Sequence, residues 1–318
     1  MRLLITGANG FVGSALCRTL GQSGHILRAA LRDECSIPEG AVEKAIVGDI
    51  CRALDWGPSL RGVDAVVHAA ARAHVLRDPP ADGKLYLETN AHATRRLVEA
   101  AARAGVRRFI YLSSIKVNGE ETLGRGYTPS DAPNPQNEYG MSKLLGEKSV
   151  LEVSARTGLQ VAIVRPPLVY GPRVRANFLR LMRWIEAGWP LPLGSVDNRR
   201  SLVSIWNLCD LVTRLLNDPL PSGRAWLVSD AEDLSTPDLI RRIGIAMGRT
   251  VRLLPVPTLL LQGAAMLAGR NAEFARLCGS LTLDVSQTRN ELGWSPPVTV
   301  NESLSRTVRW YLSRSGSA

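Results

Sequence analysis

A tyrosine and a lysine four residues apart form the pair of side chains best suited to chemistry. Tyr139 and Lys143 stand in "EYGMSK". In a helix this spacing places both side chains on one face. A nearby ammonium group stabilises a phenolate and lowers a phenol pKa that is about 10 without such a neighbour. The pair therefore predicts proton exchange with the oxygen of an alcohol or carbonyl substrate near neutral pH.

Three evenly spaced glycines mark a second candidate site. Gly7, Gly10 and Gly13 lie between an apolar strand at 2–6 and an apolar helical segment. Glycine lets a backbone turn tightly and approach a pyrophosphate, and the start of a helix offers free N–H groups and a positive dipole end. We therefore predict that this loop binds a dinucleotide. Its other predicted contacts are Asn9, Phe11 and Val12.

The end of the second strand bears on which dinucleotide is bound. A carboxylate at this place suits the ribose hydroxyls of NAD, whereas a cation suits the 2′-phosphate of NADP. Leu31 stands where the acid is expected, Arg32 follows, and Asp33 comes one residue late. These residues favour NADP(H). NAD(H) remains the alternative, with Arg32 solvated and Asp33 turned toward the ribose.

Two further strand ends carry predicted cofactor contacts. Asp49, in "GDI", is placed to accept a hydrogen bond from the adenine amino group, with Ile50 beside it. The alternative for Asp49 is a helix cap. Small side chains end the fourth strand and leave room for the dinucleotide to cross; they are Ala69, Ala70 and Ala71.

The elements that position these residues alternate regularly between strand and helix. Six apolar strands up to residue 166 predict an α/β fold, a Rossmann-type doubly wound parallel sheet with helices on both faces. Long helices are expected at 84–104 and 138–158. We predict a dinucleotide-binding domain at 1–166, with a return segment near 200–230. A smaller, mainly substrate-binding region is expected at 167–318.

Composition narrows the remaining classes of function. The net charge of +10 comes from scattered arginines and only 5% of residues are aromatic, so nucleic-acid binding is not expected. Five widely spaced cysteines favour neither a disulfide framework nor a metal site, and we expect a cytoplasmic protein. The apolar stretch at 253–269 contains two prolines and falls short of the roughly 20 residues that span a bilayer. No stable membrane insertion is expected; a buried or docking helix is predicted, with peripheral membrane contact as an alternative.

Several motifs together resemble the extended short-chain dehydrogenase/reductase family, in its branch of nucleotide-sugar epimerases, dehydratases and reductases. They are "TGANGFVG", "GDI", "HAAA", "YGMSK", "RPPLVYGP" and "LGWSPP", and they cover nearly the whole chain. The resemblance implies that Ser114 completes a catalytic group with Tyr139 and Lys143, with Ser113 as the fallback. It also implies that Lys143 contacts the nicotinamide ribose. Asn90 is implied as a structural residue beneath the site and Pro166 as a neighbour of the nicotinamide; a homodimer through the two long helices is also implied.

The same resemblance implies a substrate activated by a nucleoside diphosphate, here UDP. Arg200 matches a diphosphate-binding arginine, Asn177 a polar contact, and Arg276 a further arginine whose position fits less well. Arginine's planar fork suits phosphate oxygens. Related 4,6-dehydratases carry Asp-Glu directly after the catalytic residue, where this chain has Ile115 and Lys116. A 4,6-dehydratase is therefore not expected. Lys116 is predicted to contact a carbonyl or phosphate of the substrate, with a solvated loop lysine as the alternative.

Three functions remain open on these residues. The first is the NADPH-dependent reduction of the C4 keto group of a UDP-4-keto-6-deoxy-N-acetylhexosamine for O-antigen synthesis. Arg32 and the lack of an acid at position 31 favour it. The alternative is a UDP-hexose or UDP-N-acetylhexosamine 4-epimerase with tightly bound NAD. The third is a non-catalytic NADP-binding protein, which the intact catalytic residues disfavour.

Overall fold

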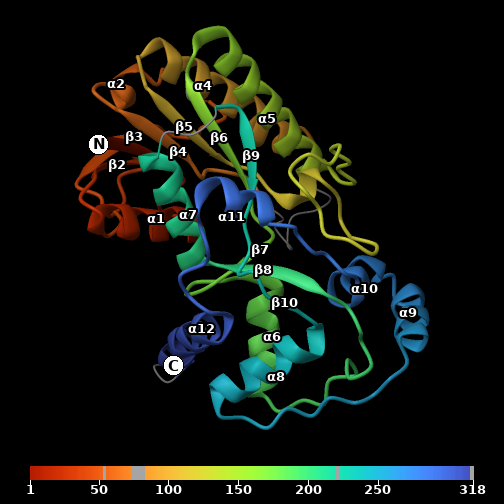
Figure 1. Ribbon diagram of the computed structural model, residues 1–318. Helices are drawn as coiled ribbons and strands as arrows, with labels where there is room; N and C mark the ends of the chain where they lie inside the picture. Colours follow the sequence, from red (N-terminus) through yellow and green to blue (C-terminus); the bar gives the residue numbers. More distant parts are fainter. Residues whose placement is uncertain (53–54, 74–82, 219–221, 316–318) are drawn as a thin grey trace.

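A seven-stranded parallel sheet forms the centre of the molecule (Figure 1). The computed structural model describes residues 1–52, 55–73, 83–218 and 222–315. The strand order is β3-β2-β1-β4-β5-β6-β9, which confirms the predicted Rossmann-type fold. Its strands are β1 (Arg2–Thr6), β2 (Ile26–Leu31), β3 (Glu43–Ile46), β4 (Ala65–His68), β5 (Arg108–Leu112), β6 (Gln160–Arg165) and β9 (Arg224–Leu227).

Helices cover both faces of this sheet because successive strand side chains point to opposite sides. In β1, Leu3 and Ile5 join the apolar cluster beneath α1 (Phe11–Gln22), α7 (Ile205–Asn217) and α11 (Ser286–Leu292). Leu4 joins the opposite cluster beneath α2 (Gly57–Leu60), α4 (Ala93–Arg103) and α5 (Glu138–Thr157). The two buried faces explain why the strands read as nearly continuous apolar runs.

The helix predicted at 84–104 is not continuous. It consists of α3 (Gly83–Leu87), a π-helical turn η1 (Glu88–His92) and α4. The Asn90 carbonyl in this turn accepts hydrogen bonds from Thr94 Oγ1 at 2.8 Å and from the Tyr111 hydroxyl at 3.2 Å. These side chains satisfy backbone bonding capacity that a regular helix would use itself.

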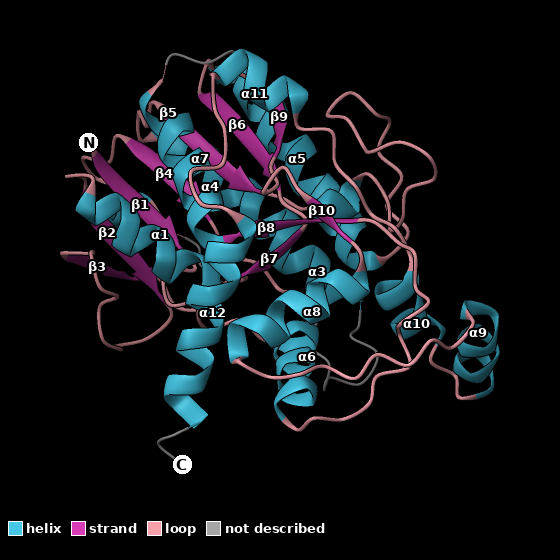
Figure 2. Cartoon of the chain, turned by 60° about the horizontal axis from the view of Figure 1, so that its bottom comes forward, coloured by secondary structure: helices cyan, strands magenta, loops and turns pink. Residues whose placement is uncertain are grey.

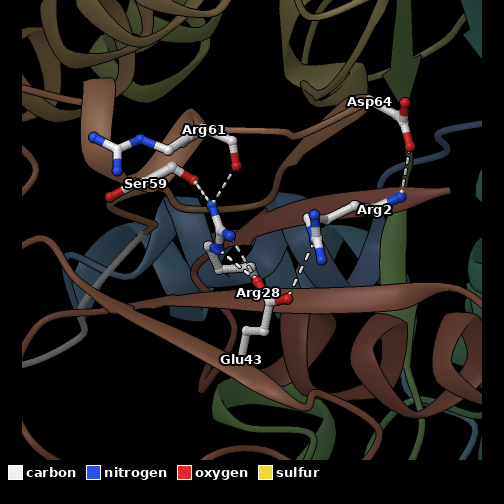
Figure 3. A network of polar contacts seen from close by, with 6 residues as sticks. All are labelled: Arg2, Arg28, Glu43, Ser59, Arg61 and Asp64. Atoms are coloured by element: carbon white, nitrogen blue, oxygen red, sulfur yellow. Dashed lines mark hydrogen bonds and ion pairs between the residues drawn. The ribbon is translucent and has the colours of Figure 1, made fainter.

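Ion pairs and hydrogen bonds tie the amino-terminal ends of β1 and β2 to neighbouring segments (Figure 3). Glu43 accepts from Arg2 at 3.2 Å and from Arg28 at 2.8 Å. The Arg2 backbone N–H donates to Asp64, and Arg28 donates to the Ser59 and Arg61 carbonyls. This network lies at the opposite ends of the strands from the glycine loop, so it serves the sheet rather than the site.

A second region packs beneath the carboxyl ends of the large sheet. A three-stranded sheet, in the order β10 (Asp233–Leu234), β8 (Arg200–Ser204), β7 (Leu168–Tyr170), lies beside α6 (Ala176–Glu186), α8 (Thr236–Met247) and α12 (Val300–Ser315). At the outer edge, α10 (Asn271–Cys278) lies against the second region and α9 (Thr258–Leu267) stands outside it (Figure 2). The predicted domain boundary at residue 166 remains a prediction. Within the predicted return segment near 200–230, β9 lies in the large sheet, whereas β8 lies in the small one.

Within the described ranges, no helix is both long enough and apolar enough to cross a membrane. The five cysteines are free thiols.

Candidate active site and cofactor site

The glycine loop is packed too tightly for any larger residue. Gly7 has φ of +65°, and a Cβ there would lie 2.8 Å from the Ala70 Cα atom. A Cβ on Gly13 would lie 2.0 Å from the Gly7 carbonyl oxygen. The Gly10 N–H donates to that same oxygen at 2.8 Å. The loop therefore holds the start of α1 against the end of β1, as a dinucleotide-binding turn requires.

The start of α1 is open to an anion. Gly10 is its N-cap, no side chain caps it, and its first turn carries no acidic residue. Such a terminus presents free N–H groups and a positive dipole end. Phe11 and Val12 are half-buried against the core, whereas Asn9 is exposed and donates to Cys35 Sγ at 2.7 Å. The free N–H groups at this helix start suit the predicted contact with a pyrophosphate.

The exposed residues after β2 and β3 lie near one another. Hydrogen bonding from the Cys51 backbone holds the pKa of Asp49 below its usual value, and the charge of Arg32 adds to this effect. Arg32 and Asp33 are both exposed, while Leu31 is buried. The Arg32 cation therefore has a carboxylate in its surroundings before any ligand binds.

Small residues follow β4 at the same edge of the sheet. Ala69 and Ala70 are half-buried and Ala71 is exposed. The Ile50 carbonyl after β3 accepts from Arg96 of α4 at 3.3 Å, which anchors that loop. These predicted cofactor contacts lie at the carboxyl ends of adjacent strands, where open α/β sheets bind their ligands.

Ser114, Tyr139 and Lys143 meet beside the end of β5. Asn137 caps α5 by accepting from the Gly140 N–H at 2.8 Å, which fixes the start of the helix that carries Tyr139 and Lys143. Burial raises the pKa of Tyr139, while a hydrogen bond with Ser114 acts in the opposite direction. Ser113 is also buried, but its hydroxyl has no partner among the described residues. The structure thus brings Ser114, rather than Ser113, to Tyr139.

Lys143 is almost completely buried. Its Nζ donates to the Leu112 carbonyl at 2.7 Å and lies 4.7 Å from the centre of the Tyr111 ring. Burial lowers the pKa of Lys143 to about 7, and the charge of Glu147 opposes that decrease. The amine therefore gains and loses its proton near neutral pH, which suits a group that assists proton transfer.

A buried ion pair lies one helical turn beyond Lys143. Arg165, at the end of β6, donates to both Glu147 oxygens, at 2.9 and 2.6 Å. The third contact of Arg165 is with the Asn118 side-chain oxygen at 3.0 Å, and Asn118 donates to the Thr128 carbonyl. Asn118 thus holds the loop after β5 against the pair that stabilises α5.

Asn90 joins the loop after β4 to α5. Its side chain accepts from the Arg72 N–H at 2.9 Å and donates to the Arg72 carbonyl and to Ser142 Oγ, each at 3.0 Å. Asn90 is fully buried. Pro166 is buried as well, and its carbonyl accepts from the Ile115 N–H at 3.0 Å, directly after Ser114.

A group of cations lies next to the predicted catalytic residues. Burial lowers the pKa of Lys116 to about 8, and the nearby charges of Arg200 and Arg276 add to this decrease. Glu120 pairs with Lys116 and also accepts from Asn137. The Arg200 guanidinium donates to the Gly279 carbonyl at 2.8 Å, which ties the start of β8 to the end of α10. Lys116, Arg200 and Arg276, here called the cation cluster, are thus brought together from three distant segments.

Asn177 lies on α6 and is not shown to join the cation cluster. Its side-chain oxygen accepts from Arg180 at 3.1 Å. Arg180 also approaches Glu273 of α10 at 3.6 Å. Asn177 is therefore linked through Arg180 to α10. Its contact with substrate remains a prediction.

Three supporting residues were missed in the sequence analysis. Glu147 follows Lys143 by four residues, so helical spacing alone places it on the same face. Tyr86 of α3 packs edge-on against Tyr139, with ring centres 6.2 Å apart. The alternation of side chains along β5 places Tyr111 on one face of the sheet. Its contact with Lys143 depends in addition on how α5 packs against that face.

The comparisons with known proteins agree with this arrangement. A model of the "NAD dependent epimerase/dehydratase family" matches residues 3–228. The chain is 40% identical over 314 residues to the UDP-glucose 4-epimerase of Vibrio cholerae, covering 98% of this chain and 95% of that relative. It is 25% identical over 323 residues to the N-acetyl-alpha-D-glucosaminyl-diphospho-ditrans,octacis-undecaprenol 4-epimerase of Escherichia coli O157:H7, covering 97% and 94%.

A solved structure shares the whole fold. MoeE5 in complex with UDP-glucose and NAD superposes with a TM-score of 0.80 at 26% identity, covering 100% of both chains. The relatives confirm the family that the motifs resemble, but they do not confirm the closer resemblance to 4-reductases and instead favour the epimerase alternative. The chain therefore belongs to the NAD-dependent epimerase/dehydratase family.

Proposed function

We propose that the protein is a 4-epimerase of UDP-activated hexoses or N-acetylhexosamines that works with NAD held in the glycine-loop site. The observation that carries this choice is the 40% identity, over 98% of the chain, to a protein named UDP-glucose 4-epimerase. The site supports it, because Ser114, Tyr139 and Lys143 suit reversible oxidation of a secondary alcohol. The reductase favoured by the sequence analysis becomes the second candidate.

The residues present fit the dinucleotide. The Gly7–Gly13 contact leaves no room for a side chain, and the uncapped start of α1 offers N–H groups to a pyrophosphate. The structural relative MoeE5 was solved in complex with NAD. This relative supports NAD over NADP. NAD when bound supplies a nicotinamide that accepts and returns a hydride at the sugar C4.

The chain's own residues handle the proton. Ser114 and Tyr139 are placed to hold the oxygen on C4, and Tyr139 takes its proton during oxidation and returns it during reduction. Tyr139 is harder to ionise because burial raises its pKa, so its phenolate needs a cation. Lys143, one helical turn away, is the cation that stabilises it.

The cation cluster supplies the other half of the proposed site. Lys116, Arg200 and Arg276 would pair with the diphosphate of the UDP-sugar, with Asn177 as an additional polar contact. Glu120 holds Lys116 in place when no diphosphate is bound.

A direct assay tests the proposal. Purified protein is incubated with UDP-glucose or UDP-N-acetylglucosamine without added NADPH, and the products are separated by chromatography and identified by NMR. We expect the C4 epimer to form. Tyr139→Phe should lower kcat by roughly 10²–10⁴-fold, the usual contribution of a general acid–base group. Nucleotide released on denaturation should be NAD.

The second candidate rests on the lack of an acid at Leu31, next to the cation of Arg32. A UDP-4-keto-6-deoxy-N-acetylhexosamine offered with NADPH tests it. Stoichiometric NADPH oxidation without any C4 epimer from UDP-glucose or UDP-N-acetylglucosamine would replace the epimerase proposal with the reductase.

A further inference from the structure

Helix α9 lies at the edge of the molecule (Figures 1 and 2), and it carries several exposed apolar side chains. None of its residues is buried. Its four most exposed apolar side chains are Leu259 at 80%, Leu260 at 65%, Met266 at 66% and Leu267 at 91%. Exposed apolar residues are common singly, but a grouped set on one element marks a contact surface.

These four side chains share one side of the helix. At about 100° per residue they fall within an arc of about 120°. Leu261 lies on the opposite side and packs partly against the apolar core of the second region. The helix is thus attached through one face and presents the other outward. Gly263 lies within the outward arc, and a Cβ there would meet no atom within 4 Å.

The charged residues on either side of α9 are mainly basic. The segment 249–272 contains three arginines and no aspartate or glutamate. Arg249 and Arg252 precede the helix, Arg270 follows it, and all three are exposed. Arg270 also approaches Glu273 at 3.7 Å, yet its side chain remains 66% exposed.

We propose that α9 docks the protein onto the surface of an anionic lipid bilayer. The outward leucines and methionine would enter the boundary between headgroups and acyl chains, and the flanking arginines would pair with lipid phosphates. A helix of ten residues is about 15 Å long, half the thickness of a hydrocarbon core, so the contact is with the surface.

The positive charge of the arginines that flank α9 favours an anionic bilayer over a second copy of the chain as the partner of α9. Two copies meeting through α9 would bring their arginines together with no acidic residue of the segment to balance them. An anionic surface balances them.

Cosedimentation with vesicles tests the docking and requires no substrate, so its outcome is independent of the proposed epimerase activity. The full chain is mixed with vesicles of phosphatidylcholine alone or of phosphatidylcholine with phosphatidylglycerol. We expect binding to the anionic vesicles, weakening as salt is added. The triple variant L259S/L260S/L267S should bind at least about tenfold more weakly, because its apolar face is lost. R252E/R270E should lose the preference for anionic vesicles.

Ile245→Ser is the matched control, because Ile245 is 78% exposed but lies on α8. This variant should bind as the wild type does, and every variant should keep the wild-type melting temperature. Equal binding of L259S/L260S/L267S and wild type would overturn the proposal, as would no wild-type binding to either vesicle. A wild-type dimer in solution that L259S/L260S/L267S converts to monomer would also overturn it, because a second copy would then cover α9.

Discussion

Glu147→Gln should destabilise the protein strongly and also change its activity profile. Glu147 and Arg165 form a bidentate pair with side chains only 3% and 7% exposed. The substitution removes the negative charge and turns one accepting oxygen into an NH2 donor, so the buried guanidinium keeps one amide oxygen at position 147 and Asn118 as its side-chain acceptors. An uncompensated buried charge is among the few single changes with a large effect on stability.

The size of the effect follows from this burial. Breaking one half of a buried pair costs about 3–5 kcal/mol in the free energy of unfolding. At about 2 °C per kcal/mol for a chain of this size, the melting temperature should fall by roughly 6–10 °C. Differential scanning calorimetry on the cofactor-saturated protein measures this decrease.

A surface pair supplies the control. Glu152 is 53% exposed and pairs with Arg95, which is 43% exposed. Glu152→Gln should leave the melting temperature unchanged, since exposed pairs contribute little. The double variant Glu147→Met/Arg165→Met removes both charges and should recover much of the lost stability. If the Glu147→Gln and Glu152→Gln variants have the same melting temperature, the buried pair does not stabilise the fold as argued.

Glu147→Gln should also change the pH dependence of kcat/KM, which a loss of stability alone would not change. The charge of Glu147 raises the pKa of Lys143, against the lowering effect of burial. Without that charge, Lys143 loses its proton at a lower pH. The alkaline limb of kcat/KM for Glu147→Gln should therefore shift to lower pH, whereas Glu152→Gln should keep the wild-type profile.

Three further substitutions test other parts of the site. Gly13→Ala should abolish nucleotide binding, measured by calorimetric titration, because its Cβ would lie 2.0 Å from the Gly7 carbonyl oxygen; retained binding would contradict the close packing. Lys116→Met should raise KM for the UDP-sugar about tenfold at neutral pH. The wild-type KM should rise as pH increases through about 8, where Lys116 loses its charge, and the variant KM should not follow. Asn90→Ala should lower the free energy of unfolding in urea by about 3 kcal/mol, because it removes the hydrogen bonds of the buried amide with the Arg72 backbone and with Ser142 Oγ; a loss under about 1 kcal/mol would argue against this role.

Most of the fold could be predicted because local signals agreed with one another. The apolar strand at 2–6 is observed at Arg2–Thr6, and the helix predicted at 138–158 at Glu138–Thr157. The interruption of the helix at 84–104 could not be predicted. It coincides with hydrogen bonds from Thr94 and Tyr111 to a single carbonyl, and Tyr111 reaches that carbonyl only because β5 lies next to it.

The candidate site was partly predictable for a related reason. Tyr139 and Lys143 are linked by helical spacing, and the same rule would have found Glu147. The contacts of Asn118 with Arg165 depend instead on β5 and β6 lying side by side, with Leu112 opposite Val164. The loops that follow these two strands therefore meet, although 47 residues separate Asn118 from Arg165.

A buried hydrogen-bond chain explains why the predicted cofactor loop and α5, which carries the predicted catalytic residues, are expected to act as one unit. Burial lowers the pKa of His68 to about 3, so the imidazole is neutral and carries one proton. Thr94 donates to the Asn90 carbonyl and so accepts from His68 Nε2 at 2.9 Å. The proton is then on Nε2, and Nδ1 must accept from Thr6 Oγ1 at 2.6 Å. Thr6 in turn accepts from the Ala70 N–H at 3.2 Å, beside the glycine loop.

Each hydroxyl in this chain donates in one direction and accepts from the other, so no member can reverse without leaving a buried group unpaired. The chain ends at Asn90, whose side chain bonds Ser142 on the helix of Tyr139 and Lys143. Directed hydrogen bonds therefore connect the end of β1 to α5. Valine at position 6 would break the chain at its first hydroxyl, so Thr6→Val should weaken both nucleotide binding and kcat, although residue 6 belongs to neither group of predicted contacts.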